Sequence, residues 1–126
     1  MVYTPISSLN HLQSEMLKSL SFYKDDLHIM ETRLQEVAWK NTSFEARQDI
    51  EHFENQFILQ RNNIGRLRHH INEFVQEAAG GIKAHDNHVK DALAEKQNKL
   101  EEDYKTLERV IGELLRDFNR FLTKWM

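Results

Sequence analysis

The amino-acid sequence predicts an all-α fold, an antiparallel up-down-up bundle of three long helices. Apolar residues recur at alternating steps of three and four residues along nearly the whole chain, and this spacing places them on one side of a helix that packs against other helices. The 126 residues include only one proline and four glycines, which excludes long irregular loops. Two short breaks, at Asn41 and at Gly80-Gly81, divide the pattern into three segments of similar length.

The first helix is predicted over residues 5–40. Thr4 and Pro5 suit its start, because proline at the first helical position lacks only an N–H that has no partner there anyway. Asn41 suits its end, since asparagine tolerates the left-handed backbone conformation that follows many helices. An additional step of four near Met16 predicts a local unwinding. The apolar row consists of Leu9, Leu12, Met16, Leu20, Tyr23, Leu27, Met30, Leu34 and Val37.

The second helix is predicted over residues 43–79, ahead of the two glycines. Thr42 and Glu45 form a capping box, in which each side chain accepts a hydrogen bond from the backbone of the other. Gln60 is the only polar residue in the apolar row of this segment. The row consists of Ala46, Ile50, Phe53, Phe57, Gln60, Ile64, Leu67, Ile71, Phe74 and Ala78.

The third helix is predicted over residues 82–125 and is the longest. Its row carries His85 and Lys96 at two positions, so its first half is only weakly apolar. Because two short turns make neighbouring helices antiparallel, residues 119–126 are expected to project beyond the start of the second helix. The row consists of Ile82, His85, Val89, Leu93, Lys96, Leu100, Tyr104, Leu107, Ile111, Leu114, Phe118, Phe121 and Trp125. The whole chain, residues 1–126, forms one domain of this kind.

The composition excludes several classes of function. A formal net charge of −3 argues against a general nucleic-acid binder, which needs an excess of basic residues. The chain has no cysteine, and this excludes thiolate chemistry and suits a reducing compartment. No apolar run approaches the roughly 20 residues of a membrane span, and residues 1–10 lack the features of a secretory signal. A cytoplasmic location is therefore expected.

One polar layer is predicted inside the bundle. The expected alignment of the helices brings Gln60 close to Tyr23 and Tyr104, so the three side chains are expected to hydrogen-bond to one another. Such a layer fixes the alignment of helices, because a buried amide without partners is costly. A small ligand bound among these side chains is the alternative interpretation.

Histidines gather at the end of the bundle that holds Gly80-Gly81. A metal site is predicted there from His11, His70, His88 and Asp91, with His70 expected opposite Asp91. Imidazole and carboxylate ligands together suit zinc, iron or manganese. The alternative is that these histidines are ordinary exposed residues.

Aromatic and apolar residues gather at the opposite end. They are predicted to contact a partner, and they consist of Trp39, Phe44, Phe118, Phe121, Leu122 and Trp125. Two alternatives stay open: these residues cap the core, or they attach the protein to a membrane surface. Further apolar residues lie off the main rows and suggest additional contact surface, namely Leu17, Phe22, Ile29, Ile58, Leu59 and Val75.

The sequence therefore predicts a non-enzymatic interaction or scaffold protein without a cofactor. Its expected partner is a second copy, giving a homodimer, or another helical protein. A metal-binding bundle is the first alternative. An enzyme or carrier of small molecules with its site at the polar layer is the second, although no phosphate-binding loop or nucleophile motif is present.

Overall fold

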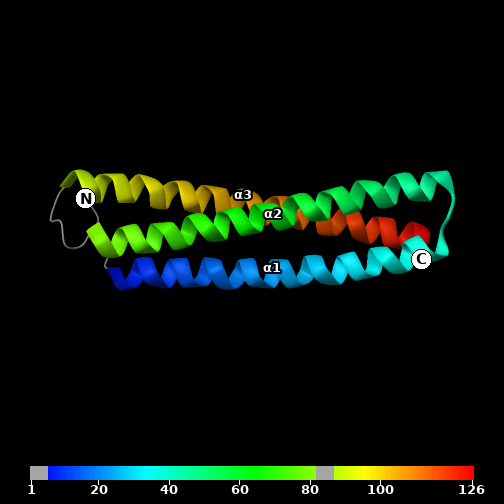
Figure 1. Ribbon diagram of the computed structural model, residues 1–126, viewed down its shortest axis with the longest axis horizontal. Helices are drawn as coiled ribbons and strands as arrows, with labels where there is room; N and C mark the ends of the chain where they lie inside the picture. Colours follow the sequence, from blue (N-terminus) through cyan, green and yellow to red (C-terminus); the bar gives the residue numbers. More distant parts are fainter. Residues whose placement is uncertain (1–5, 82–86) are drawn as a thin grey trace.

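The protein is an all-α bundle of three long helices (Figure 1). The computed structural model describes residues 6–81 and 87–126, and it describes the side chains of residues 11–80 and 91–126. Helix α1 spans Ile6–Lys40, α2 spans Phe44–Gly81 and α3 spans Asn87–Trp125. These helices lie alongside one another as a slender rod, and the α1–α2 turn lies at the same end as the C-terminal end of α3. The predicted fold class is confirmed.

The largest difference from the predicted boundaries is at the start of α3. This helix begins at Asn87 rather than at residue 82, and α2 continues through both glycines to Gly81. Residues 82–86 lie outside the described part of the chain. Because α3 begins later than expected, each of its residues lies nearer the C-terminal end of α2 than predicted. This shift changes which side chains of the two helices meet.

The turn between α1 and α2 is closed by Asn41 and Ser43. The Asn41 N–H donates to the Val37 carbonyl at 3.0 Å, and the Asn41 side-chain amide donates to the same carbonyl at 3.0 Å. Ser43 Oγ accepts a hydrogen bond from the Ala46 N–H at 3.2 Å, so Ser43 caps α2. The prediction that Thr42 caps this helix is wrong by one residue.

The core row of α1 is continuous. Gln13 is buried at this level whereas Leu12 is 41% exposed, so the row runs through Gln13 before it reaches Met16 and Leu20. The steps of three and four then alternate without interruption, and the unwinding predicted near Met16 is absent. The apolar pattern predicted Leu12 in the core row instead of Gln13 because leucine is apolar and glutamine is not.

The same correction applies to α3. Gln97 is buried in the row where Lys96 was predicted, and Lys96 is an exposed residue whose Nζ lies 2.5 Å from the Glu77 carboxylate of α2. The step from Gln97 to Leu100 is then three residues, and the row continues in regular alternation to Trp125.

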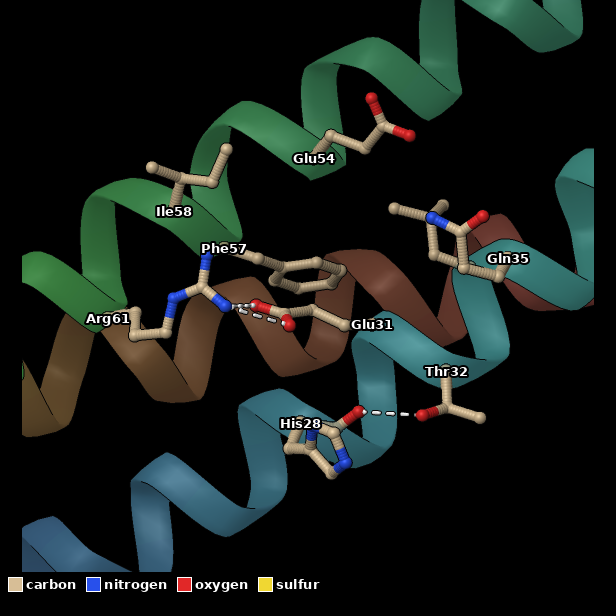
Figure 2. A pocket seen from close by; sticks show the side chains of 9 residues that line it. His28, Glu31, Thr32, Gln35, Glu54, Phe57, Ile58 and Arg61 are labelled. Carbon is tan, nitrogen blue, oxygen red and sulfur yellow. Dashed lines mark hydrogen bonds and ion pairs between the residues drawn. The ribbon is translucent and has the colours of Figure 1, made fainter.

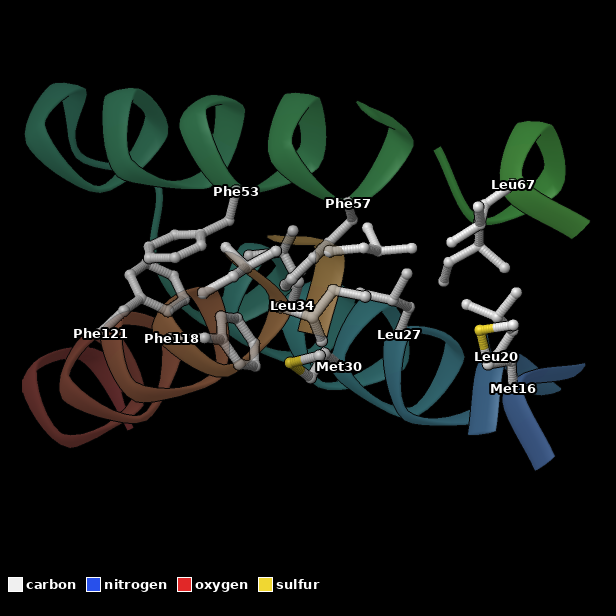
Figure 3. Packing of buried hydrophobic residues seen from close by; sticks show 14 of the residues in the cluster. Met16, Leu20, Leu27, Met30, Leu34, Phe53, Phe57, Leu67, Phe118 and Phe121 are labelled. Carbon is white, nitrogen blue, oxygen red and sulfur yellow. The ribbon is translucent and has the colours of Figure 1, made fainter. Parts of the chain in front are cut away.

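One continuous apolar core runs along the rod between the three helices (Figure 3). Leu67 and Leu107 are buried in it, as the apolar rows predict. No helix in the described ranges is long and apolar enough to cross a membrane.

Helix α2 packs closely against both α1 and α3, whereas α1 and α3, which run parallel, pack less closely against each other. Hydrogen bonds from α1, and from Asn41 just after it, reach α3 in the described part of the chain: Gln13 to Gln97, Tyr23 to Glu108, and the Asn41 side chain to the backbone carbonyl of Trp125. The bonded residues are 84 or 85 positions apart in each case. Residues of α1 and α3 separated by this number therefore lie at the same level of the rod.

Candidate interaction surface

Phe118 and Phe121 belong to the core and are not available to a partner. They are only 1% and 5% exposed. Their rings pack against Phe53 of α2, with centroid distances of 5.3 and 4.9 Å (Figure 3). Their predicted role as exposed contact residues is therefore wrong, because the shift of α3 brings them level with the interior of α2. The alternative that aromatic residues cap the core applies to these two.

The end of α3 does not project beyond α2. The Trp125 Nε1 donates to the Asp49 carboxylate at 3.0 Å, and Lys124 Nζ lies 2.7 Å from Glu45. The hydrogen bond to Glu45 raises the pKa of Lys124. Leu122 and Trp125 are each partly buried against the core. The predicted projection of residues 119–126 is therefore absent.

Trp39 and Phe44 are the two aromatic residues of this end that are exposed to solvent. Trp39 lies in the last turn of α1 and is 83% exposed, and Phe44 begins α2 and is 76% exposed. They flank the same turn, and we refer to them as the turn aromatics. Neither side chain is among the residues that form the hydrophobic core or pack against it.

A second group of exposed apolar residues lies along the rod. Phe22 and Ile29 of α1 are 62% and 59% exposed. Ile58 and Leu59 of α2 are about half exposed. The sequence identified all four as residues off the main rows, since their spacing does not match the core alternation.

The predicted polar layer is present only in part. Tyr23 and Tyr104 come together, and the Tyr23 hydroxyl donates to the Glu108 carboxylate at 3.2 Å. Burial, followed by the charges of Tyr104 and Glu108, raises the pKa of Tyr23 above its usual value. Gln60 is buried as predicted, but its Oε1 accepts from Asn63 Nδ2 of the same helix at 3.3 Å. The structure therefore places Tyr104 and Glu108 beside Tyr23, whereas Gln60 bonds within its own helix.

A second polar layer, which the sequence did not predict, lies nearer the other end. The Gln13 amide donates to Gln97 Oε1, and Gln97 Nε2 donates to the Glu101 carboxylate at 2.9 Å. Since a carboxylate only accepts, Glu101 fixes the direction of both bonds. Gln13 Oε1 has no partner among the described residues. The regular alternation of three and four residues is the signal that identifies these glutamines as core residues.

The structure does not bring His70 and Asp91 of the predicted metal site together. His70 lines an open groove between α2 and α3 together with Asp103. Asp91 lies on α3 about 18 Å from Asp103 towards the N-terminal end of that helix, at 1.5 Å per residue. His11 is exposed, and the side chain of His88 lies outside the described part. Among the described side chains, no group of three or more ligands is arranged to hold a metal ion.

A second open groove lies between α1 and α2 (Figure 2). Arg61 of α2 forms an ion pair with Glu31 of α1 at 3.0 Å across it, and Thr32 Oγ1 donates to the His28 carbonyl at 3.1 Å. The groove is floored by Leu34 and Phe57 of the core. Two of its charged groups, Arg61 and Glu31, are paired with each other, and the Thr32 hydroxyl bonds to a backbone carbonyl rather than to a general base.

Comparisons with family models, with curated proteins and with solved structures find no match to this chain. The geometry and chemistry of its own residues therefore carry the functional argument.

Proposed function

We propose that this chain is a non-enzymatic helical interaction module. Its partner is a second copy of itself or another helical protein, and the contact uses apolar side chains that its own core leaves exposed. On this proposal the protein acts in the cytoplasm, a reducing compartment that suits a chain without cysteine.

The observation that carries the proposal is the exposure of large apolar side chains on a molecule whose core is already filled. The turn aromatics Trp39 and Phe44 are more than three-quarters exposed, and Phe22 and Ile29 are more than half exposed. Isolated exposed apolar residues are common, whereas contiguous exposed apolar patches are typical of contact surfaces. Burial of these side chains against a partner is favourable in proportion to the apolar area removed from water.

Sedimentation velocity over a wide range of protein concentration tests the proposal. We expect the wild-type chain to associate reversibly, and we expect Trp39→Glu/Phe44→Glu or Phe22→Glu/Ile29→Glu to weaken this association. Gln48→Glu/Gln76→Glu is the matched control, because it adds two charges at exposed positions and removes no apolar side chain. A wild-type chain that stays monomeric at every concentration contradicts self-association.

A further inference from the structure

The open groove between α2 and α3 combines a buried amide and an arginine with an apolar floor. We call it the α2–α3 groove, and its volume is about 350 Å³. Gln60 lines it with only 3% of its surface exposed, and the hydrogen bond from Asn63 occupies the Gln60 oxygen. The Nε2 group is therefore the donor that Gln60 offers to a ligand. The residues that line the groove include Gln60, Arg66 and Leu67 of α2 and Asp103, Leu107 and Val110 of α3.

Arg66 brings a positive charge to this groove that no carboxylate balances. The residues three and four positions away from it on α2 are asparagines and histidines, so its own helix supplies no acidic neighbour. None of the ion pairs among the described side chains involves Arg66. The groove contains the Asp103 carboxylate, but Lys99 Nζ lies 3.5 Å from it. The charge of Arg66 is therefore left for a ligand to balance.

The groove between α1 and α2 shows the opposite arrangement. Its arginine, Arg61, is paired with Glu31 of α1 at 3.0 Å, so the charge is balanced inside the molecule. Both grooves have buried core side chains as a floor, and in the α2–α3 groove these are Leu67 and Leu107. The unpaired arginine therefore predicts that an anion binds in the α2–α3 groove and not in the other one.

We propose that the α2–α3 groove binds a small organic monocarboxylate with an apolar body. The guanidinium group of Arg66 presents parallel N–H donors that match the two oxygens of a carboxylate, and the Gln60 amide provides a further donor. Leu67, Leu107 and Val110 supply apolar surface for the body of the ligand, and its removal from water adds to the affinity. A single arginine suits a single negative charge better than it suits a dianion such as phosphate.

This inference goes beyond the proposed function and is independent of it. The turn aromatics flank the α1–α2 turn, and neither of them lines the α2–α3 groove. A chain that stays monomeric can still bind the carboxylate, and a chain that associates can still fail to bind it. Measurements of ligand binding and of association therefore test the two proposals separately.

Nuclear magnetic resonance spectra of the isotope-labelled chain test the site during a titration with phenylacetate. We expect the side-chain signals of Gln60 and Arg66 to shift with a roughly millimolar dissociation constant, which is typical of a ligand with so few atoms. The signals of Arg61 should stay in place. Phenylacetamide, which has nearly the same shape without the charge, should shift the signals of the groove only slightly. Equal shifts at Arg61 and Arg66 would show unspecific ionic contact and contradict the inference.

Inorganic phosphate distinguishes a carboxylate with an apolar body from any small anion. We expect phosphate to bind at least about tenfold more weakly than phenylacetate, because it makes no use of the apolar floor of the groove. Phosphate binding as tight as that of phenylacetate would mean that charge alone attracts the ligand. That outcome contradicts the proposed ligand class.

Replacement of arginine provides a matched pair of variants. We expect Arg66→Gln to weaken phenylacetate binding at least about tenfold, because the charge-assisted hydrogen bonds to the carboxylate are lost. Arg68→Gln is the control, since Arg68 is an exposed arginine of the same helix that does not line the groove, and it should leave binding nearly unchanged. Thermal unfolding verifies that both variants fold. Equal affinities of the two variants overturn the inference.

A bulky side chain in the groove tests the position of the ligand. Thr106 is exposed and lines the groove, so Thr106→Trp fills part of the groove without a change in the core. We expect this variant to lose most of its phenylacetate binding and to keep its thermal midpoint. Undiminished binding to Thr106→Trp would place the ligand elsewhere and contradict the assignment of the site.

Discussion

At the scale of single residues, the buried glutamines show how a polar side chain can belong to a core row. Gln13 and Gln97 are 2% and 7% exposed, and the Gln13 amide donates to Gln97 Oε1 across the two parallel helices. A buried amide that loses its partner keeps its desolvation cost without the compensating hydrogen bond. The pair therefore penalises any other alignment of α1 and α3, including one in which Gln13 faces an apolar residue.

Removal of one glutamine should cost more than removal of both. We expect Gln97→Leu to lower the free energy of unfolding by about 1–3 kcal/mol, because Gln13 then has no partner. The double variant Gln13→Leu/Gln97→Leu should recover much of this loss, since leucines fill the layer without unpaired polar atoms. Denaturant unfolding of the four chains measures the coupling. Additive losses in the double variant would count against a mutual contact.

Tyr23 should make stability depend on alkaline pH. Its pKa is raised in the folded protein, so the unfolded chain ionises first as the pH rises through about 10. The folded state then binds more protons than the unfolded state, and stability falls with increasing pH above this value. We expect the fall to be smaller for Tyr23→Phe in denaturant unfolding measured between about pH 8 and about pH 11. An identical pH dependence of both chains contradicts this role.

At the scale of helices, the first turn of α2 depends on Ser43 rather than on the neighbouring threonine. Ser43 Oγ accepts from the Ala46 N–H, one of the backbone donors that the helix itself leaves without a partner. We expect Ser43→Ala to lower the free energy of unfolding by about 1 kcal/mol and Thr42→Ala to leave it nearly unchanged. Thermal unfolding of the two variants distinguishes the caps. The reverse order would restore the capping box that the sequence suggests.

Gly65 is a position where α2 can be made more stable. It lies inside the helix, and a Cβ atom added there meets nothing within 4 Å. Alanine loses less conformational freedom than glycine on folding, so Gly65→Ala should raise the free energy of unfolding by about 0.5–1 kcal/mol. Denaturant unfolding measures the change. A loss of stability would mean that the position has a close neighbour.

At the scale of the whole molecule, the number of helices and most of their core rows could be predicted from the sequence. The periodicity identified residues such as Leu67 and Ile111 because apolar side chains at that spacing have one side to bury. The alignment of α3 could not be predicted in the same way. It depends on where the connection after Gly81 ends, and no periodic signal marks Asn87 as the first helical residue. The predicted roles of Phe118 and Phe121, and the pairing of His70 with Asp91, depended on that alignment.

The continuous core predicts cooperative unfolding. Apolar contacts run from Met16 to Phe121 without a break into separate clusters, so neither end of the rod has a core of its own. We expect far-ultraviolet circular dichroism, which reports on all helices, and tryptophan fluorescence, which reports on the end with Trp39 and Trp125, to give the same midpoint. An earlier transition in the fluorescence would show that this end unfolds independently.

The parallel arrangement of α1 and α3 has a kinetic consequence. Helix α2 meets each neighbour through a short connection, so either hairpin closes a small loop when it forms. The bonds between α1 and α3 join residues 84 or 85 positions apart, and their formation as a first event would close a much larger loop at greater entropic cost. We therefore expect folding to start in either hairpin and the hydrogen bonds between the first and last helices to form last.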